Sequence, residues 1–312
     1  MRTNYWSIEA GSEVEMLQLA RTAVGTALGR LWRVDENRRL AAVREPGWFR
    51  MRDGFWMHVN PEQYWDQEVI KRGGQWEPGL IRIIKAVVAP GDLCLDIGSH
   101  KGYVSCVLAL AVGSSGRVLS FDPDPRLGEE LRNNVARNGF DQVTYFPLAL
   151  GDKKSRIKLL LTNTLGWSTS FPSSLAGPDV IKEIDVEAST VDLVLSEIGA
   201  DQKSVSFIKV DAEGAEPLIW RGMRNMLSRS SPVIAMEINF SAMKAGGFSL
   251  DAFSEEIKAE GYSTICEITS SRTFGGVKLS PVDIRRERGL LIEVLMARPN
   301  SPSFKRIRSL MK

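Results

Sequence analysis

The sequence is poor in three features that often define a protein's class: cysteine, long hydrophobic runs and net charge. Its 312 residues include only three cysteines, Cys94, Cys106 and Cys266, all in apolar runs and at spacings that match no zinc-binding pattern. We therefore interpret them as small buried residues in a reducing compartment. No run of about 18 apolar residues occurs, so no transmembrane helix is predicted. The net charge of +2 creates no strong field for nucleic acid or acidic lipid.

The N-terminal segment is acidic ahead of its first apolar stretch. Glu9, Glu13 and Glu15 argue against a secretory signal, so we expect a cytoplasmic protein. Residues 12–32 place apolar side chains along one helical face, and Ser12 with Glu15 fits a capping box. This predicted helix packs either on the rest of the chain or on a second subunit, which leaves a homo-oligomer open.

What the chain contains is an ordinary globular composition, 43% hydrophobic and 25% charged, at a length that supports a large core. Two alternating apolar and polar runs flank Asp53 and Gly54, which predicts a β-hairpin. From residue 92, apolar runs alternate with helical patterns, as in a mostly parallel sheet with helices on both faces. We therefore divide the chain into a helical and hairpin extension, residues 1–78, and an α/β domain, residues 79–312. Strands are predicted at residues 93–95, 116–121, 143–146, 205–210, 232–236 and 290–296, with an added antiparallel pair at 157–161 and 184–188.

A glycine-containing loop follows the first strand of the α/β domain. Asp96 ends the strand, Gly98 and Gly102 bracket a tight turn, and an apolar helix begins at Tyr103. Glycine lets the backbone approach a ligand closely, and the helix start offers unpaired N–H groups. Taken alone, the loop fits an ordinary strand–turn–helix connection equally well.

Four of the predicted strands end in an acidic residue: Asp96, Asp122, Asp211 and Glu237. Ligands of open parallel sheets bind beyond the carboxyl ends of the strands, and Asp122 is placed to accept hydrogen bonds from ribose hydroxyls. The expected ligand is therefore an adenosine-like nucleotide. A pyrophosphate cofactor needs one more glycine than this loop has, and Asp96 would repel phosphate while suiting the ammonium group of a methionine moiety. We therefore favour S-adenosylmethionine over NAD.

The chain also carries several motifs in a characteristic order. They are Asp96-Ile97-Gly98 with Gly102, Phe121-Asp122-Pro123 with Pro125, Leu131 with Asn134 and Asn138, Ala149-Leu150-Gly151-Asp152, and Phe207-Ile208-Lys209-Val210-Asp211 with Glu213-Gly214-Ala215-Glu216. Over roughly residues 45–240 they resemble the FkbM family of S-adenosylmethionine-dependent methyltransferases, and Gly74-x-Trp76-Glu77-Pro78 is similar to that family's lead-in. Two departures are His100, where the family commonly has Asn, and Asp122, where it commonly has Glu. Asp shortens the reach to the ribose but keeps the chemistry. His100 has no interpretation at this stage, and Asn134 and Asn138 are interpreted as helix-surface and helix-end residues.

The resemblance implies a Rossmann-like class I methyltransferase fold, with a seven-stranded sheet of six parallel strands and one antiparallel strand. It also implies O-methylation of a hydroxyl on a sugar, glycoside or other natural product. We assign cofactor binding to Glu77, Asp96, Gly98, Ser99, Gly102, Tyr103, Asp122, Pro123 and Ala149.

Candidate bases for the hydroxyl proton are, in order, Asp211, Glu213 and Glu237, because they follow the central strands. Capping of the next helix by Asp211 and a favourable dipole at Glu213 would explain the acidity without chemistry. A divalent cation held by Asp211, Glu237 and Asn239 is an alternative that we do not favour. Acceptor contacts are assigned to Trp76, Trp167, Ser168 and Asn239, of which Trp167 and Ser168 lie in a polar insertion that either covers the acceptor or is a mobile loop.

Other functional interpretations remain beside this one. The chain could be a nucleotide-binding scaffold without catalysis, or a methyltransferase acting on a macromolecule, whereas a dehydrogenase is disfavoured by the loop. The expected partner is a small-molecule or glycan acceptor, and neither nucleic acid nor a membrane is expected.

Overall fold

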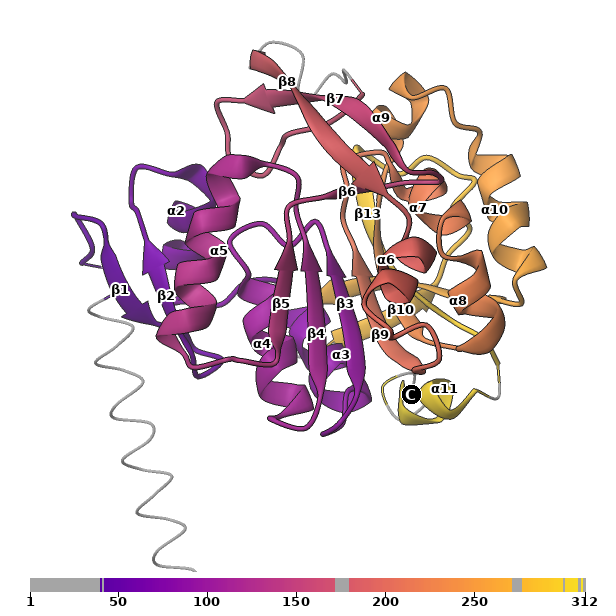
Figure 1. Cartoon of the computed structure of the whole chain (residues 1–312), viewed down its shortest axis with the longest axis horizontal. Helices are drawn as coiled ribbons and strands as arrows, with labels where there is room; N and C mark the ends of the chain where they lie inside the picture. Colours follow the sequence, from indigo (N-terminus) through magenta and orange to yellow (C-terminus); the bar gives the residue numbers. More distant parts are fainter. Residues whose placement is uncertain are drawn as a thin grey trace, which may run out of the picture.

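The computed structural model describes residues 40, 42–171, 180–270, 277–299, 301–307 and 310 (Figure 1). The predicted helix at residues 12–32, its capping pair and any subunit contact that it makes lie outside the described residues.

An eight-stranded sheet runs through the centre of the molecule. Its strands are β3 (Leu93–Ile97), β4 (Arg117–Phe121), β5 (Val143–Phe146), β9 (Val205–Val210), β10 (Val233–Asn239), β11 (Thr264–Ser270), β12 (Val277–Pro281) and β13 (Leu291–Ala297). Their spatial order is β12-β11-β13-β10-β9-β3-β4-β5. The pairs from β10 to β5 are parallel, whereas β13 is antiparallel to both β10 and β11.

This topology confirms the predicted class I fold, because six strands run in one direction and β13 runs against them. The predicted count of seven strands is wrong by one: β12 adds an antiparallel edge strand to β11. Neither β11 nor β12 is among the strands that the sequence predicts.

Helices cover both faces of the sheet: α3 (Pro78–Val87), α4 (Tyr103–Val112), α5 (Pro125–Arg137), α6 (Val191–Glu197), α7 (Glu216–Arg221), α8 (Arg224–Arg229), α9 (Phe240–Ala245), α10 (Leu250–Ala259) and α11 (Pro302–Ile307). Successive side chains of β3 point to opposite faces of the sheet, so neighbouring residues join different hydrophobic cores. Leu93, Leu95 and Ile97 join the core that includes α6, α7, α8 and α10. Cys94 joins the core that includes α3 and α4. The three predicted buried cysteines are confirmed as buried and unpaired.

The predicted hairpin is confirmed as β1 (Gly47–Arg50) and β2 (Trp56–Val59), which pair antiparallel and are followed by α2 (Tyr64–Lys71). Helix α5 holds β2 through two asparagines. Asn134 accepts a hydrogen bond from the His58 N–H at 2.9 Å, and Asn138 accepts one from the Trp56 N–H at 2.7 Å. The prediction that Asn134 is a surface residue is therefore wrong: its side chain is fully buried. Asn138 does end the helix.

A buried lysine joins α2 to the loop after β3. The Lys101 ammonium lies 2.6 Å from the carboxylates of both Asp66 and Glu130, and it donates to Gln63 at 2.7 Å. Side chains of the hairpin and of α2 belong to the same hydrophobic cluster as α3 and α4. The domain boundary at residue 78 stays a prediction.

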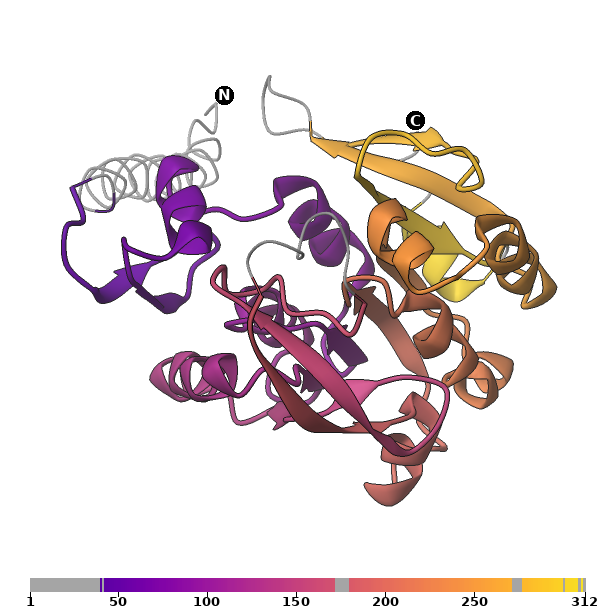
Figure 2. The same cartoon turned by 90° about the horizontal axis from the view of Figure 1, so that it is seen from above.

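A second, three-stranded sheet lies beyond the carboxyl ends of β3, β4 and β5, at the top of Figure 1 and across the front of Figure 2. It consists of β6 (Ala149–Leu150), β7 (Ser155–Thr162) and β8 (Val180–Ser189). Strands β7 and β8 pair antiparallel, as predicted, and β6 runs parallel to β8.

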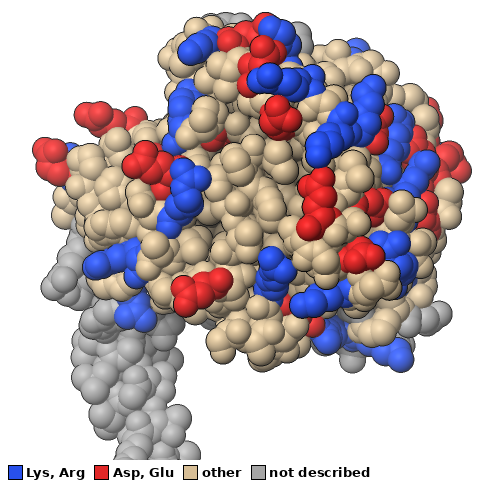
Figure 3. Space-filling view, viewed as in Figure 1, with Lys and Arg blue, Asp and Glu red and all other residues tan. Residues whose placement is uncertain are grey.

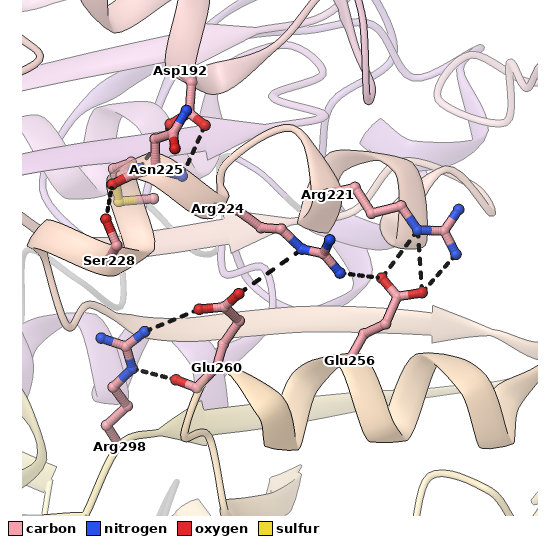
Figure 4. A network of polar contacts seen from close by, with 9 residues as sticks. Asp192, Arg221, Arg224, Asn225, Ser228, Glu256, Glu260 and Arg298 are labelled. Carbon is pink, nitrogen blue, oxygen red and sulfur yellow. Dashed lines mark hydrogen bonds and ion pairs between the residues drawn. The ribbon is translucent and has the colours of Figure 1, made fainter.

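A network of ion pairs ties α7 and α8 to α10 on one flank of the molecule (Figure 4). Glu256 binds Arg221 at 2.7 Å and Arg224 at 3.0 Å, and Glu260 lies 3.6 Å from Arg298. None of these residues lines the large cavity at the carboxyl ends of the strands.

Charges of both signs are interspersed over the face seen in Figure 3. Within the part of the chain that the structure describes, no helix is long and apolar enough to cross a membrane.

Candidate active site

The loop after β3 can form only with glycine at its first turn. Gly98 has a φ of 73°, and a Cβ atom there would lie 1.7 Å from the carbonyl oxygen of Asp211. Gly102 has a φ of 84°, and its Cβ would lie 3.1 Å from Leu131. The two glycines therefore let the loop pass between β9 and α5.

Asp122, at the carboxyl end of β4, is tied to this loop. One carboxylate oxygen accepts the His100 N–H at 2.8 Å, and the other accepts the Asp124 N–H at 3.0 Å. Burial raises the pKa of Asp122 to about 7. The carboxylate is thus held in place by the backbone and faces the cavity that it lines with Pro123.

Asp96 lies deeper than a direct ligand contact at the end of β3 would require. Its side chain is fully buried, and it accepts a hydrogen bond from the Ser105 hydroxyl of α4 at 2.6 Å. Burial raises its pKa. Asp96, Gly102 and Asn239 are the three predicted site residues that do not line the cavity, so any contact that they make with a ligand is indirect in this arrangement.

A cavity of about 310 Å³ opens at the carboxyl ends of β3, β4, β9 and β10. Every other predicted site residue lines it: Trp76, Glu77, Gly98, Ser99, Tyr103, Asp122, Pro123, Ala149, Trp167, Ser168, Asp211, Glu213 and Glu237. One end is apolar and is formed by Leu127, Leu148, Ala149, Leu150, Ile157 and Leu159. Aromatic side chains of Tyr64, Trp65, Trp76 and Trp167 form another part of the wall.

The remaining end of the cavity is acidic. The Lys209 ammonium lies 3.1 Å from the Asp211 carboxylate and donates to the Gly98 carbonyl at 2.7 Å. Burial opposes the charge of Lys209, but the neighbouring carboxylates, Asp211 above all, raise its pKa. Glu213 accepts a hydrogen bond from the Asn239 amide at 2.8 Å, and burial, followed by the charge of Asp211, raises its pKa to about 8.

Two glutamates face one another across the β10–β13 ladder. Glu237 and Glu293 are directly paired in the antiparallel register, where like charges repel. Burial, followed by nearby carboxylates, raises the pKa of each well above its usual range. Both line a smaller cavity of about 120 Å³, which shares Glu77, Lys209, Asp211, Glu237 and Leu291 with the large one.

Glu77 connects the two cavities from the loop ahead of α3. It has a φ of 38°, a left-handed conformation that is unusual for a residue with a side chain. Burial raises its pKa to about 7. Pro78 is the first residue of α3, so the strained residue lies directly before the helix.

The carboxylates of Asp211, Glu213 and Glu237 lie close enough to ligate one cation, since their oxygens are within 4.8 Å of one another. This set differs from the alternative drawn from the sequence. The side-chain oxygen of Asn239 caps α9 and its amide group donates to Glu213, so neither is directed at a cation. Glu213 replaces Asn239 as the third candidate ligand. The Lys209 ammonium beside Asp211 already supplies positive charge there.

Sequence reasoning missed several lining residues. Lys209 and Glu293 each carry a charge within an otherwise apolar buried strand, and that contrast is the signal that marks them. Tyr64 and Trp65 begin α2, and no sequence motif assigns them a role in the site. His58 lies outside the cavity lining and packs against Trp48.

Comparison with known proteins identifies the family of the chain. The model of the methyltransferase FkbM domain matches residues 96–264. A protein-L-isoaspartate O-methyltransferase of Methanocella arvoryzae is 30% identical over 92 residues, covering 28% of this chain and 49% of the relative. An arsenite methyltransferase of Halobacterium salinarum is 37% identical over 60 residues, covering 19% and 15%. The chain thus spans half or less of the length of these two curated relatives.

Among solved structures, the S-adenosylmethionine-dependent O-methyltransferase of Thermotoga maritima has a TM-score of 0.38 at 15% identity, covering 81% of this chain and 77% of that one. The O-methyltransferase of Bacillus cereus in complex with S-adenosylhomocysteine has a TM-score of 0.38 at 14% identity, covering 71% and 79%. The family match extends over more than half of the chain and includes the loop after β3, the end of β4 and the acidic end of β9, so the recognition made from the sequence motifs is confirmed and the chain belongs to the FkbM methyltransferase domain family.

Proposed function

We propose that the chain is an S-adenosylmethionine-dependent methyltransferase that methylates a hydroxyl oxygen of a sugar, glycoside or other natural product. One observation carries the proposal. A single cavity joins an apolar end, the fixed carboxylate of Asp122 and an acidic end at Asp211 and Glu213. These three parts match in order the adenine, ribose and sulfonium-bearing methionine of that cofactor.

The residues present fit the cofactor. The Ser99 hydroxyl is buried at the cavity wall and has no hydrogen-bond partner among the described residues, which leaves it free for a polar ligand. Asp122 presents a carboxylate whose orientation two backbone N–H groups fix. The cofactor supplies the electrophilic methyl group; the protein has to orient it and receive a proton.

Glu213 is the best-placed base for an O-linked reaction. Asp211 is engaged by Lys209, and Glu237 lies opposite Glu293 in the β10–β13 ladder, where burial and neighbouring carboxylates raise its pKa. A base works best with a pKa near the working pH, and that of Glu213 is raised to about 8. Asn239 holds the Glu213 carboxylate in place. This ranking replaces the order taken from the sequence.

The acceptor side combines indole rings with carboxylates. Trp65 and Trp76 lie with ring centroids 5.3 Å apart, and Glu77 lies next along the chain. Indole faces pack against the C–H groups of sugar rings, and carboxylates accept hydrogen bonds from hydroxyls. Both features favour a polyhydroxylated acceptor.

A methyltransferase acting on a macromolecule is the second candidate, and the protein-L-isoaspartate O-methyltransferases among the relatives favour it. A carboxylate acceptor would add a further negative charge to an acidic end in which Lys209 is the one lysine or arginine among the described lining residues. A neutral hydroxyl pays no such penalty, which is why we rank it first. A scaffold without catalysis would bind the cofactor and transfer nothing.

The test uses S-adenosylmethionine labelled in its methyl group, with a panel of glycosides and hydroxylated natural products and a parallel panel of isoaspartyl peptides. We expect label in an ether linkage of a hydroxylated acceptor. Base-labile label in a peptide would replace this proposal by the second candidate. Binding without transfer to either panel would favour the scaffold.

A further inference from the structure

Residues 162–171, which begin at the last residue of β7, form a cover over the cavity. Leu165, Gly166, Trp167 and Ser168 all contribute to the lining, between the ribose carboxylate Asp122 and the acidic end. A backbone bridge between Leu160 and Thr169 folds the covering segment back on β7. Beyond that bridge, side-chain hydrogen bonds attach the segment at two points, one at Asp124 and Arg126 beside Asp122 and one at Glu213.

The first attachment is made by two residues at the start of α5. Arg126 donates to the Thr162 carbonyl at 2.8 Å and to the Ser168 hydroxyl at 3.1 Å, so a single guanidinium holds both ends of the turn. The Ser168 hydroxyl in turn donates to Asp124 at 2.7 Å. Asp124 also receives Arg126 at 2.6 Å and caps α5. Planar, multiply bonded contacts of this kind fix geometry as well as adding energy.

The second attachment joins the segment to the acidic end. The Thr169 hydroxyl, buried with 3% of the residue exposed, donates to the carbonyl of Glu213 at 2.8 Å. Glu213 has a φ of 51°, which is costly for a residue with a side chain. The contact therefore helps to hold the candidate base in its unusual conformation.

Between the attachments, the segment closes tightly on the loop after β3. Gly166 has a φ of 92°, and a Cβ there would lie 2.7 Å from the ring of His100. Both ring nitrogens of His100 are buried without a hydrogen-bond partner among the described residues. Trp167 packs edge-on against Tyr64 of α2, with ring centroids 5.9 Å apart. His100, unexplained from the sequence, is thus part of the surface on which the segment closes.

We propose that residues 162–171 form a lid on the bound cofactor, and that Arg126 and Thr169 are positioning residues that hold this lid closed. The inference rests on the proposed function for the identity of the cofactor. Neither residue lies among the glycine-loop and strand-end positions that the sequence marks. Because the closed segment covers the ligand from the ribose to the acidic end, the cofactor leaves only when the two attachments open. Loss of either one shortens the residence time of the cofactor more than it changes the rate of entry.

The test measures association and dissociation rates of S-adenosylhomocysteine by stopped-flow competition. The variants are Arg126→Gln and Thr169→Val, with Thr169→Ser as the conservative partner that keeps the hydroxyl. We expect dissociation to accelerate about tenfold in the first two, which corresponds to about 1.4 kcal/mol. Association should change less than twofold, and Thr169→Ser should restore the wild-type rate. Hydrogen exchange of residues 162–171 in the bound state should rise in parallel.

Glu183→Gln is the matched control. It breaks the exposed ion pair between Lys158 and Glu183 on the β7–β8 hairpin and should leave both rates unchanged. Unchanged dissociation in Arg126→Gln and Thr169→Val would overturn the lid. So would failure of Thr169→Ser to restore the rate, because that result assigns Thr169 a packing role. If the unaltered protein does not bind S-adenosylhomocysteine at all, the proposed function itself has failed.

Discussion

The Lys209 ammonium lies 3.1 Å from the carboxylate of Asp211, inside the cavity and beneath the loop after β3. Because it also donates to the Gly98 carbonyl at 2.7 Å, one side chain connects that loop to the acidic end of β9. It is the only lysine or arginine in the lining of either cavity among the described residues, where Glu77, Asp211 and Glu237 line both. The stability of the acidic end therefore depends on this single cation.

Replacing Lys209 by methionine should destabilise the fold. The change keeps most of the side-chain volume but leaves buried carboxylates without their counter-charge, which typically costs about 3 kcal/mol. The free energy of unfolding from urea titration measures it. Lys158→Met removes a lysine whose side chain is 62% exposed and should leave the free energy of unfolding nearly unchanged. Equal losses in the two variants would refute the role given to Lys209.

The rate of methyl transfer should rise with pH through about 8. Burial and the charge of Asp211 raise the pKa of Glu213 to about 8, so at pH 6 the carboxyl is protonated and cannot accept a proton. Glu213→Gln should lower kcat about 10²-fold or more and abolish the alkaline rise, while sparing cofactor affinity. Glu237→Gln, in the same cavity, should keep the rise. The pH–rate profiles of the two variants and the unaltered protein test this prediction. A rate that still rises with pH in Glu213→Gln would exclude Glu213 as the base.

Asp122→Ala should weaken the binding of S-adenosylhomocysteine about tenfold or more. The variant removes the carboxylate assigned to the ribose hydroxyls, and hydrogen bonds to charged groups contribute about 1.5–3 kcal/mol. Calorimetry measures the change. Asp152→Ala, in an exposed turn beyond β6, serves as the control and should bind normally. Wild-type affinity in Asp122→Ala would disprove the ribose assignment.

Asn134→Leu should detach the hairpin from α5. The His58 N–H and the Lys101 carbonyl both lose their partner, at a cost of about 1–3 kcal/mol for each group that stays buried. Asn133→Leu, at the exposed neighbouring position of the same helix, should change stability by less than about 0.5 kcal/mol. Urea unfolding of the two variants compares them directly. Indistinguishable midpoints would mean that α5 does not hold the hairpin through Asn134.

Much of the central sheet could be predicted because its strands are short apolar runs that end in acidic residues. Leu93–Ile97 and Val205–Val210 are strands of this kind, and their parallel pairing brings Ile97 beside Val210. The carboxylates that follow these strands therefore lie at the same edge of the sheet. The positions of the strands in the sequence are enough to predict that these carboxylates lie close together.

The edge strand β12 could not be predicted in the same way. Val277–Pro281 has no fully buried residue and no acidic end. Val277 and Leu279 pack against the core but are only partly buried, so the strand carries little hydrophobic pattern. The burial of Asn134 escaped prediction for a related reason. Its place depends on β2, which lies 76 residues away in the sequence.

Site residues were predictable where a local sequence motif identifies them. They were not predictable where two segments that are distant in the sequence have to meet. Gly98 and Asp122 could be named from the motifs. The Glu237–Glu293 pair depends on the antiparallel return of β13, and the contact between Thr169 and Glu213 depends on how the segment after β7 folds back. Asp96 carries the motif but lies behind the cavity wall, since its strand faces α4 at that position.

Titration calorimetry of the full chain with S-adenosylmethionine, S-adenosylhomocysteine and NAD shows whether the cavity is the binding site of a methyl donor. We expect micromolar binding of both adenosyl ligands and none of NAD, because the cavity combines an apolar end and the Asp122 carboxylate with an acidic end that disfavours the negative charge of a pyrophosphate. Binding of NAD without binding of S-adenosylmethionine or S-adenosylhomocysteine would contradict it.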